Sequence, residues 1–417
     1  MPWNVTDTVD ERMRFVVAAQ SGTLSMTVVC AGFGISRETG YKWLARYTDG
    51  GFAALSDGSR ARRRQSTSMP EEITVLLLAL REQRPRWGQK KLRGFLTRDR
   101  PDLSWPAAST IGDLLRREGL VTPRRVRARG VEQIQPHSTA LAPNEIWGID
   151  FKGWFRTRDG TRCDPLTVTD VMSRYLLLCE IVAPTLEGVW PACQRLFAEH
   201  GQPRAFRMDN GSPFGSKGAA GLTKLSVLWI KLGIALEPIT PGHPGENGRH
   251  ERMHRTLKQE TSTPPAASSA EQQRRFDRFR VDFNEVRPHE ALGQRTPASE
   301  HRANARLYTG RLDDPWYDAE HRVHRVLATG QIRWQGGLLY ISEALAGELI
   351  GLVVLPSGDH IARFATIDLG VISRGTSDFT RFGAARPGRV QSRRAGEPGG
   401  GDAATHPVRS VNDDQTP

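Results

Sequence analysis

The chain has 417 residues, enough for about two to four domains with cores of their own. Its 38% of hydrophobic and 25% of charged residues are ordinary for a soluble globular protein. The 58 basic residues outnumber the 46 acidic ones, which gives a net charge of +12, and arginine is far more frequent than lysine. This balance favours a polyanionic partner, nucleic acid above all, because the planar arginine fork binds two phosphate oxygens at once.

Cysteine spacing and the lack of long apolar runs argue against other classes of protein. The four cysteines are widely spaced and form no C-x-x-C pair, which speaks against a disulfide framework and a cysteine-based zinc site. No apolar run reaches the ~18 residues of a membrane span, and Met1–Gln20 is acidic and amphipathic rather than signal-like. We therefore expect a protein of a reducing cytosol without a membrane partner.

The segment 1–55 has the pattern of a helix-turn-helix domain. Residues 30–47 read CAGFGISRETGYKWLARY, with a Gly-containing turn, Ser36 as N-cap and a helix with a polar front. The first residues of such a helix can face base edges in DNA. An αα-hairpin without a DNA contact has the same pattern and remains an alternative. The residues of this helix that we expect to contact DNA are Arg37, Lys42 and Arg46.

A polar, basic linker at 56–69 separates this domain from a second helical domain, which we expect at 70–125. Apolar residues recur there with the helical period, and the segment 106–120 resembles a second helix-turn-helix. The stripes consist of Ile73, Leu76, Leu77 and Leu80, then Leu92, Phe95 and Leu96, then Ile111, Leu114 and Leu115.

An arginine-rich run follows the second helical domain. Between Arg116 and Arg129 there are six arginines and one acid, which suits a phosphate-contacting arm and, nearly as well, a disordered linker. A linker is expected at 126–142. The residues of this run that we expect to contact DNA are Arg124, Arg125 and Arg127.

From Pro143 the sequence predicts a mixed α/β domain. Together with a C-terminal helix, this domain is expected to cover residues 143–305. Strand patterns at 145–155 and 165–182 are joined by a Gly-centred turn, and a short strand at 205–212 ends in a turn. Helical patterns cover 186–200 and 221–233, and a loop at 263–273 precedes a helix through Phe276, Phe279 and Phe283.

The C-terminal part predicts a small β domain and a tail. Residues 320–375 have the pattern of a small barrel or meander, with turns at Gly336-Gly337 and Ser357-Gly358. Residues 384–417 are rich in Gly, Pro, Arg and Asp with almost no apolar residues, which predicts a disordered tail.

Three acidic residues of the α/β domain suggest a metal site. Asp150 lies in the apolar strand WGIDF, where a charge is costly to bury unless it is paired or bound to metal. Asp209 precedes a turn at the end of a strand, and Glu251 lies on a helix. Carboxylates converging from two strands and a helix suit Mg²⁺. Each acid alone also has a simple structural explanation, as a strand-end cap, a turn residue or half of an ion pair.

The helix that carries Glu251 is basic on one face. Glu251, His254, Arg255 and Lys258 follow at the spacing of one helix face, so we expect Arg255 and Lys258 to hold DNA phosphate beside the carboxylates.

WGIDFKGWF, LTVTDVMSRYLL, RMDNGSPF and PGHPGENGRHERMHRTLK resemble the core motifs of the retroviral-integrase superfamily, most of all insertion-sequence transposases. The resemblance spans nearly the whole chain. It implies an N-terminal all-α helix-turn-helix region, a central α/β ribonuclease H-like catalytic core and a small C-terminal β domain. It also implies a catalytic and metal-binding triad of Asp150, Asp209 and Glu251, because the glutamate of the family follows the N-G turn; Glu246 is then a loop residue.

The resemblance implies a function as well. Such a protein binds double-stranded DNA, both element ends and target, and uses Mg²⁺, with Mn²⁺ as substitute and two ions, for strand cleavage and strand transfer. Joining two ends in one event implies a homo-oligomer. The expected location is the bacterial cytoplasm, in association with the nucleoid. Two alternatives remain: a DNA-binding regulator without catalysis, and a metal-dependent nuclease without strand transfer.

The chain departs from the family pattern in two respects. Forty-one residues separate Asp209 from Glu251, more than is usual, and we expect the excess at 216–226. No His-His-Cys-Cys zinc module is present, so end recognition is left to the helix-turn-helix segments. Asp170 matches an acid of the second strand in the family and is expected to be structural or to support a metal ligand. For His243, Asn210 and Asn247, a place at the site and a role in turns are equally open.

Overall fold

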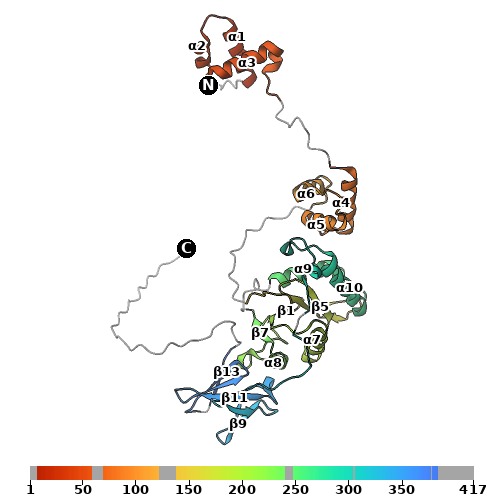
Figure 1. Ribbon diagram of the computed structural model, residues 1–417, viewed down its shortest axis with the longest axis vertical. Coiled ribbons are helices and arrows are strands. Elements are labelled where there is room, and N and C mark those ends of the chain that lie inside the picture. Colours follow the sequence, from red (N-terminus) through yellow and green to blue (C-terminus); the bar gives the residue numbers. More distant parts are fainter. Residues whose placement is uncertain are drawn as a thin grey trace, which may run out of the picture. The chain divides into compact units, whose positions relative to one another are not determined.

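The computed structural model describes residues 7–58, 69–121, 138–239, 248–303, 306–376 and 378–383. These fall into two compact units, Met1–Glu71 and Glu72–Pro417 (Figure 1). The domain boundaries that we predict within the second unit remain predictions, because residues 72–417 form a single compact unit. Arg124, Arg125, Arg127, His243, Glu246 and Asn247 lie outside the described residues, as do most of both predicted linkers and the tail.

The first unit is a bundle of three helices, α1 (Thr8–Gln20), α2 (Met26–Gly32) and α3 (Arg37–Gly50). The expected turn and cap are confirmed: Gly34 has a φ of +65° and the Ser36 hydroxyl accepts from Thr39 N at 3.1 Å. The helices pack closely, since a Cβ on Gly40 would lie 2.6 Å from Cys30 Sγ. Phe15, Val16, Val29, Cys30 and Leu55 form the core.

The second unit begins with three more helices, α4 (Glu71–Gln83), α5 (Gln89–Asp99) and α6 (Ala108–Arg117). The predicted apolar stripes are confirmed in all three helices. Their buried members are Ile73, Leu77, Leu80, Leu92, Leu96, Ile111, Leu114 and Leu115. Trp87, between α4 and α5, is fully buried as well.

A mixed sheet with the strand order β5-β4-β1-β6-β7 forms the centre of the second unit (Figure 1). Its strands are β1 (Ile146–Phe151), β4 (Pro165–Asp170), β5 (Leu176–Ile181), β6 (Ala205–Met208) and β7 (Ala235–Pro238). β4 is antiparallel to β1 and β5, whereas β1, β6 and β7 are parallel. The residues that follow β1 and β6 therefore meet at one edge of the sheet. This is the expected ribonuclease H-like core.

Helices cover both faces of this sheet. On one face lie α7 (Leu186–His200) and α8 (Lys224–Lys231), and on the other α9 (Gly248–Thr261) and α10 (Ser269–Val281). Successive side chains of a strand point to opposite faces. Trp147 and Ile149 of β1 therefore join the core under α7 and α8, while Gly148 and Asp150 face histidines of α9. Strand alternation thus places Asp150 on the α9 face.

Of two connections in the core, the first has the predicted structure and the second does not. The Gly-centred turn between β1 and β4 forms the expected hairpin, β2 (Phe155–Arg156) with β3 (Arg162–Cys163). The loop predicted to run to residue 273 is wrong at its end, because α10 begins at Ser269. Ser268 caps this helix by accepting from Glu271 N at 3.3 Å, and Glu271 in turn accepts from Ala267 N at 3.0 Å.

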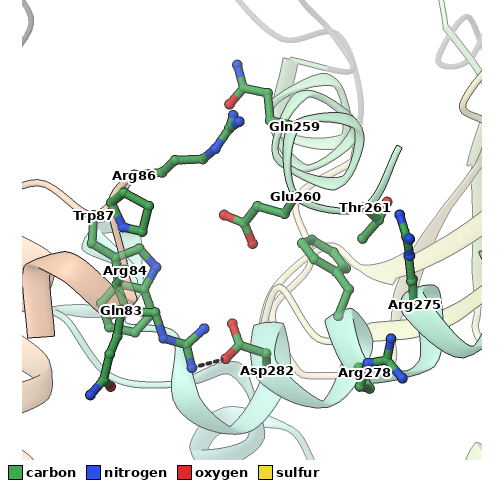
Figure 2. Close-up of a pocket in the computed structure, with 12 residues that line it drawn as sticks. Gln83, Arg84, Arg86, Trp87, Gln259, Glu260, Thr261, Arg275, Arg278 and Asp282 are labelled. Atoms are coloured by element: carbon green, nitrogen blue, oxygen red, sulfur yellow. Dashed lines mark ion pairs between the residues drawn. The ribbon is translucent and has the colours of Figure 1, made fainter. Parts of the chain in front are cut away.

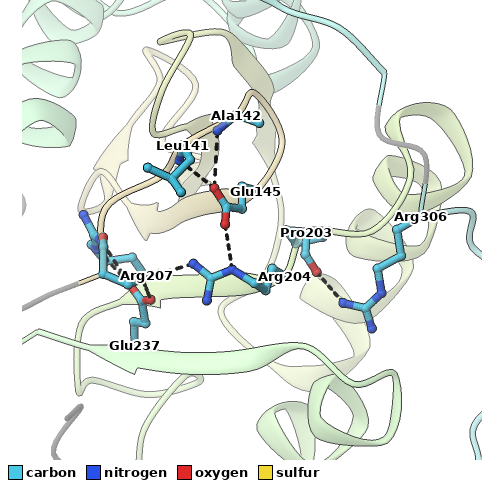
Figure 3. Close-up of polar contacts among 9 residues, drawn as sticks. Leu141, Ala142, Glu145, Pro203, Arg204, Arg207, Glu237 and Arg306 are labelled. Atoms are coloured by element: carbon cyan, nitrogen blue, oxygen red, sulfur yellow. Dashed lines mark hydrogen bonds and ion pairs between the residues drawn. The ribbon is translucent and has the colours of Figure 1, made fainter.

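Buried ion pairs tie the start of the core to the β6–β7 edge (Figure 3). Arg207 of β6 contacts Glu237 of β7 at 2.9 Å, and both side chains are nearly inaccessible to solvent. Arg207 also donates to Ser138 O at 2.8 Å, and Arg204 contacts Glu145 at 3.0 Å. These contacts hold the segment before β1 against the two parallel strands.

The C-terminal part is all-β after the short helix α11 (Pro297–Glu300). Its strands are β8 (Arg322–Arg325), β9 (Gln331–Trp334), β10 (Gly337–Tyr340), β11 (Leu349–Val354), β12 (His360–Phe364), β13 (Ile367–Ile372) and β14 (Phe379–Arg381). β9 and β10 form a hairpin, and the others form an antiparallel sheet in the order β14-β13-β12-β11-β8. The predicted turns are confirmed, with φ of +80° at Gly336 and +83° at Gly358.

Residues 216–226, where we expect the excess between Asp209 and Glu251, contact this β region. Ala219, Ala220 and Leu222 pack into the same apolar cluster as Ile350 and Leu369. Ala220 N donates to Phe382 O at 3.0 Å. All four cysteines are buried with free thiols. Among the described residues, no helix combines the length and apolar character that a bilayer span requires.

Candidate active site

Asp150, near the C-terminal end of β1, is the acid whose environment is most perturbed. Its side chain is largely buried between the sheet and α9. Burial raises the pKa of Asp150 to about 7, and the negative charges of Asp209 and Glu251 contribute to this rise. The raised pKa reflects the free-energy cost of burying a charge in this apolar strand. The charges of Asp209 and Glu251 increase this cost.

Asp209 follows the last residue of β6, which is the parallel neighbour of β1. Burial raises the pKa of Asp209, although its carboxylate accepts from Gly211 N at 3.2 Å. The carboxylate packs closely on Gly211, where a Cβ would lie 3.1 Å from it. Asn210 donates to Ile239 O at 2.6 Å, so its side chain is a satisfied turn residue that ties the end of β6 to β7.

Glu251 lies in the first turn of α9 and is exposed. The structure thus brings all three predicted acids to one edge of the sheet. The three acids are not closely clustered. In the described part of the chain, the group whose possible metal-ligating atoms all lie within 4.8 Å of one another consists of Asp150, His250 and His254. The three acids do not form such a group.

The two histidines belong to a buried network around Thr167, the residue opposite Asp150 on β4. Thr167 donates its hydroxyl to Asp150 O at 3.1 Å. His250 Nε2 lies 2.6 Å and His254 Nε2 2.7 Å from the same oxygen, so both can donate to it. His254 Nδ1 then faces the Asp150 carboxylate at 3.8 Å. Burial lowers the pKa of His250 to about 3 and that of His254 to about 2, so both rings are neutral.

The sequence analysis missed this network, although one signal was present. Residues 250–254 read HERMH, two histidines one helical turn apart with a glutamate between them, a pattern that also occurs in zinc proteases. The structure does not favour zinc here, because both Nε2 atoms are within hydrogen-bond distance of Thr167 at the sheet–helix interface. Gly148 makes room for this packing, since a Cβ there would lie 3.1 Å from His250 Nδ1.

The acids themselves suit a divalent metal. Three carboxylates supply hard oxygen ligands, which Mg²⁺ prefers, and their mutual repulsion is expressed in the raised pKa of Asp150. A cation among them would relieve both the repulsion and the cost of burial. Asp150, Asp209 and Glu251 therefore have the donor atoms that a divalent metal ion needs.

The residues that we predict to contact DNA differ in their exposure and hydrogen bonding. Arg255 and Lys258 are exposed on α9, but His254, expected on the same face, turns inward to Thr167. In the first unit Arg37 and Lys42 are exposed. Arg46 instead donates to Ser56 O at 3.0 Å and stacks on Trp43.

Asp170 has the structural surroundings that we expect for it. It is fully buried at the end of β4, where it accepts from Asn144 N at 3.0 Å and from Ser173 N at 2.8 Å. These bonds fix the β4–β5 turn and the entry into β1.

Known protein families match both units of the chain. Residues 140–244 match the Integrase core domain family, and residues 232–297 match a second family with the same description. Residues 11–64 match the Helix-turn-helix domain family, and residues 39–115 the Homeodomain-like domain family.

Among solved structures, the HTLV-2 integrase catalytic core domain in complex with magnesium aligns with 39% of this chain and 100% of its own, at 16% identity and a TM-score of 0.31. The simian T-cell lymphotropic virus intasome in complex with a PP2A subunit aligns with 72% of this chain and 99% of its own, at 16% identity and a TM-score of 0.34.

Two relatives come from insertion elements. The chain is 29% identical over 243 residues to the insertion element IS407 uncharacterized 31.7 kDa protein of Burkholderia multivorans, covering 56% of this chain and 83% of that protein. It is 26% identical over 240 residues to the IS476 uncharacterized 39.2 kDa protein of Xanthomonas euvesicatoria, covering 56% of this chain and 65% of that protein. These matches to integrase core and helix-turn-helix families, together with the likeness to insertion-element proteins, support an insertion-sequence transposase with a retroviral integrase-type core.

Proposed function

We propose that the protein catalyses metal-dependent cleavage of DNA at the ends of a mobile element and joins those ends to target DNA. The observation that carries this proposal is the convergence of Asp150, Asp209 and Glu251, close enough for the latter two to raise the pKa of Asp150. A protein that only binds DNA has no physical need for three mutually repelling carboxylates at one sheet edge.

In this proposal the three acids hold two Mg²⁺ ions. The chemistry that such ions supply is activation of the attacking oxygen and stabilisation of charge on the leaving oxygen in an in-line phosphoryl displacement. Water is the first attacking group and exposes a 3′-OH, which then attacks the target strand. No covalent protein–DNA intermediate is required, so no serine or tyrosine nucleophile is assigned.

The other side chains orient and bind. Thr167 and the two histidines hold the β1 backbone at Asp150 in place. Lys258 and Arg255 bind phosphates of the DNA beside the acids. The first unit binds the element ends, and a homo-oligomer brings two ends together.

Nicking of supercoiled plasmid in Mg²⁺ or Mn²⁺ tests the proposal without knowledge of the cognate ends. We expect Asp150→Asn, Asp209→Asn and Glu251→Gln each to lower the nicking rate at least about a hundredfold, because each removes a metal ligand. Chelation of the metal should abolish nicking. Glu246→Gln, at the other glutamate of the same segment, is the matched control and should keep full activity.

Two outcomes would contradict the assignment. If Glu246→Gln is inactive and Glu251→Gln active, the wrong glutamate has been chosen. If the wild-type protein nicks neither plasmid nor duplexes with selected end sequences, yet binds them, it is a DNA-binding protein without catalysis. Strand transfer is separated from hydrolysis by joining of a labelled end duplex to a plasmid.

A further inference from the structure

A cavity of about 330 Å³ beside the site has a strongly basic lining. It lies between α9, the β4–β5 turn, α5 and the segment after α10. Six arginines and Lys91 line it, against only two acids, Asp170 and Glu290. His250 belongs to its wall, so the cavity lies directly behind the network that holds Asp150.

The two acids of the lining are already occupied. Asp170 accepts from Asn144 N and from Ser173, and Glu290 pairs with Lys90 outside the lining. Their charges act on Arg174 and Lys91, but neither acid forms an ion pair with an arginine of the described lining.

Only part of the positive charge is compensated. Arg207 pairs with Glu237 and Arg287 with Glu260, each at 2.9 Å. Within the described ranges, no carboxylate forms an ion pair with the other five cations of the lining. These are Lys91, Arg174, Arg249, Arg252 and Arg255.

Arg174 is the residue that lacks a partner most clearly. It lies in the β4–β5 turn with a φ of +65°, and its Nη1 atom is buried without a hydrogen-bond partner among the described residues. A buried donor without an acceptor costs free energy that a ligand can recover. Burial and the charges of Arg249 and Arg252 lower the pKa of Arg174 to about 10, which shows how closely these cations crowd one another.

Lys91 approaches the same space from α5. Burial and the charge of Arg287 lower its pKa to about 8.

A larger cavity of the second unit, of about 630 Å³, has a different balance of charge in its lining (Figure 2). There Arg84 pairs with Asp282 at 2.6 Å, and four arginines stand against two acids in the lining, so the excess of positive charge is smaller.

We infer that the cavity bounded by Lys91, Arg174, Arg249 and Arg252 is a phosphate-binding site, distinct from the Asp150–Asp209–Glu251 site. A phosphate group offers several acceptor oxygens and at least one negative charge, which match the unpaired Arg174 donor and the excess of cations. The phosphate belongs either to the DNA backbone or to a small phosphorylated molecule. The inference does not depend on the proposed catalysis, since binding and nicking are separate measurements.

Calorimetric titration of the full chain with pyrophosphate at low ionic strength, without metal, tests the inference. We expect saturable binding at one site per chain, weakened about tenfold in Arg174→Gln and in Arg249→Gln, because each removes a charged donor. Arg333→Gln is the matched control, with the same loss of charge at an exposed position of β9. Should Arg174→Gln fail to fold by circular dichroism, the exposed Arg252→Gln reports on the same cavity.

The inference is overturned if the wild-type protein shows no saturable binding, or if Arg333→Gln weakens binding as much as the cavity variants. A second titration with duplex DNA identifies the source of the phosphate. If it is the DNA backbone, pyrophosphate competes with DNA and Arg174→Gln reduces the salt dependence of DNA affinity by about one contact. If it is a small molecule, pyrophosphate binds equally well to the DNA-saturated protein.

Discussion

At the scale of single residues, Thr167 is the point where the sheet, α9 and the predicted metal site meet. Its hydroxyl group donates to the carbonyl oxygen of Asp150 and lies within hydrogen-bond distance of both buried histidine rings. We expect Thr167→Val, which keeps the shape and removes the oxygen, to lower plasmid nicking about tenfold, since it frees the residues that orient Asp150. It should also destabilise the second unit by about 2 kcal/mol, because two buried N–H groups lose an acceptor.

Thr169→Val is the matched control for this substitution. Its hydroxyl contacts His250 Nδ1 at 3.2 Å, and it lies two residues further along β4, opposite Gly148. Equal loss of nicking in both variants would mean that Thr167 acts only through packing on this face of the sheet.

At the scale of elements, the buried Arg207–Glu237 pair links the parallel strands β6 and β7 (Figure 3). Glu237→Gln would leave Arg207 without its counter-charge, at a cost of about 3–5 kcal/mol. We therefore expect faster hydrogen exchange in β6 and β7, measured by mass spectrometry on peptides that cover these strands. Since Asp209 directly follows β6, metal-dependent nicking should fall as well.

An exposed pair provides the comparison for this experiment. Asp113 and Arg116 contact each other at 2.6 Å on the surface of α6. Asp113→Asn should change neither exchange nor nicking, because exposed pairs contribute little to stability. If Glu237→Gln leaves the exchange of β6 unaltered, hydrophobic packing alone holds this edge of the sheet.

At the scale of the whole molecule, the expected recognition of DNA ends and the predicted catalytic acids lie in different compact units. Arg37 and Lys42 are exposed at the front of α3 in the first unit. We expect Arg37→Ala and Lys42→Ala each to weaken binding to end duplexes, selected from random sequence, about tenfold by gel shift. Arg14→Ala, which removes an exposed charge from α1, should have little effect; equal weakening would indicate general electrostatic attraction instead of readout by α3.

Much of the architecture was predictable from the sequence, because local signals and burial agree there. The Ser36 cap, the leucine stripes of α4–α6 and the glycines of the β turns are confirmed, since each depends on a few neighbouring residues. The α10 start was misplaced, because the Ser268 cap overrides a stretch whose composition resembles a loop.

The spacing of acids along strands and helix, together with the family motifs, also pointed to Asp150, Asp209 and Glu251 as a set. Their closeness could not be read from the chain itself. It follows from the parallel pairing of β1 with β6 and from the packing of α9 on the opposite face from α7 and α8.

Sequence alone thus determined most of the helices and strands, although not β7, and the basic character of the protein, because these depend on residue type and short-range period. The acids worth testing came from their positions together with the family motifs. Only the tertiary structure decided which side chains meet. It turned His254 inward to Thr167 and gave Arg46 a backbone partner. It also gathered Lys91, Arg174 and Arg249 from distant segments around one cavity. Such contacts join residues far apart in the chain, so no local pattern records them.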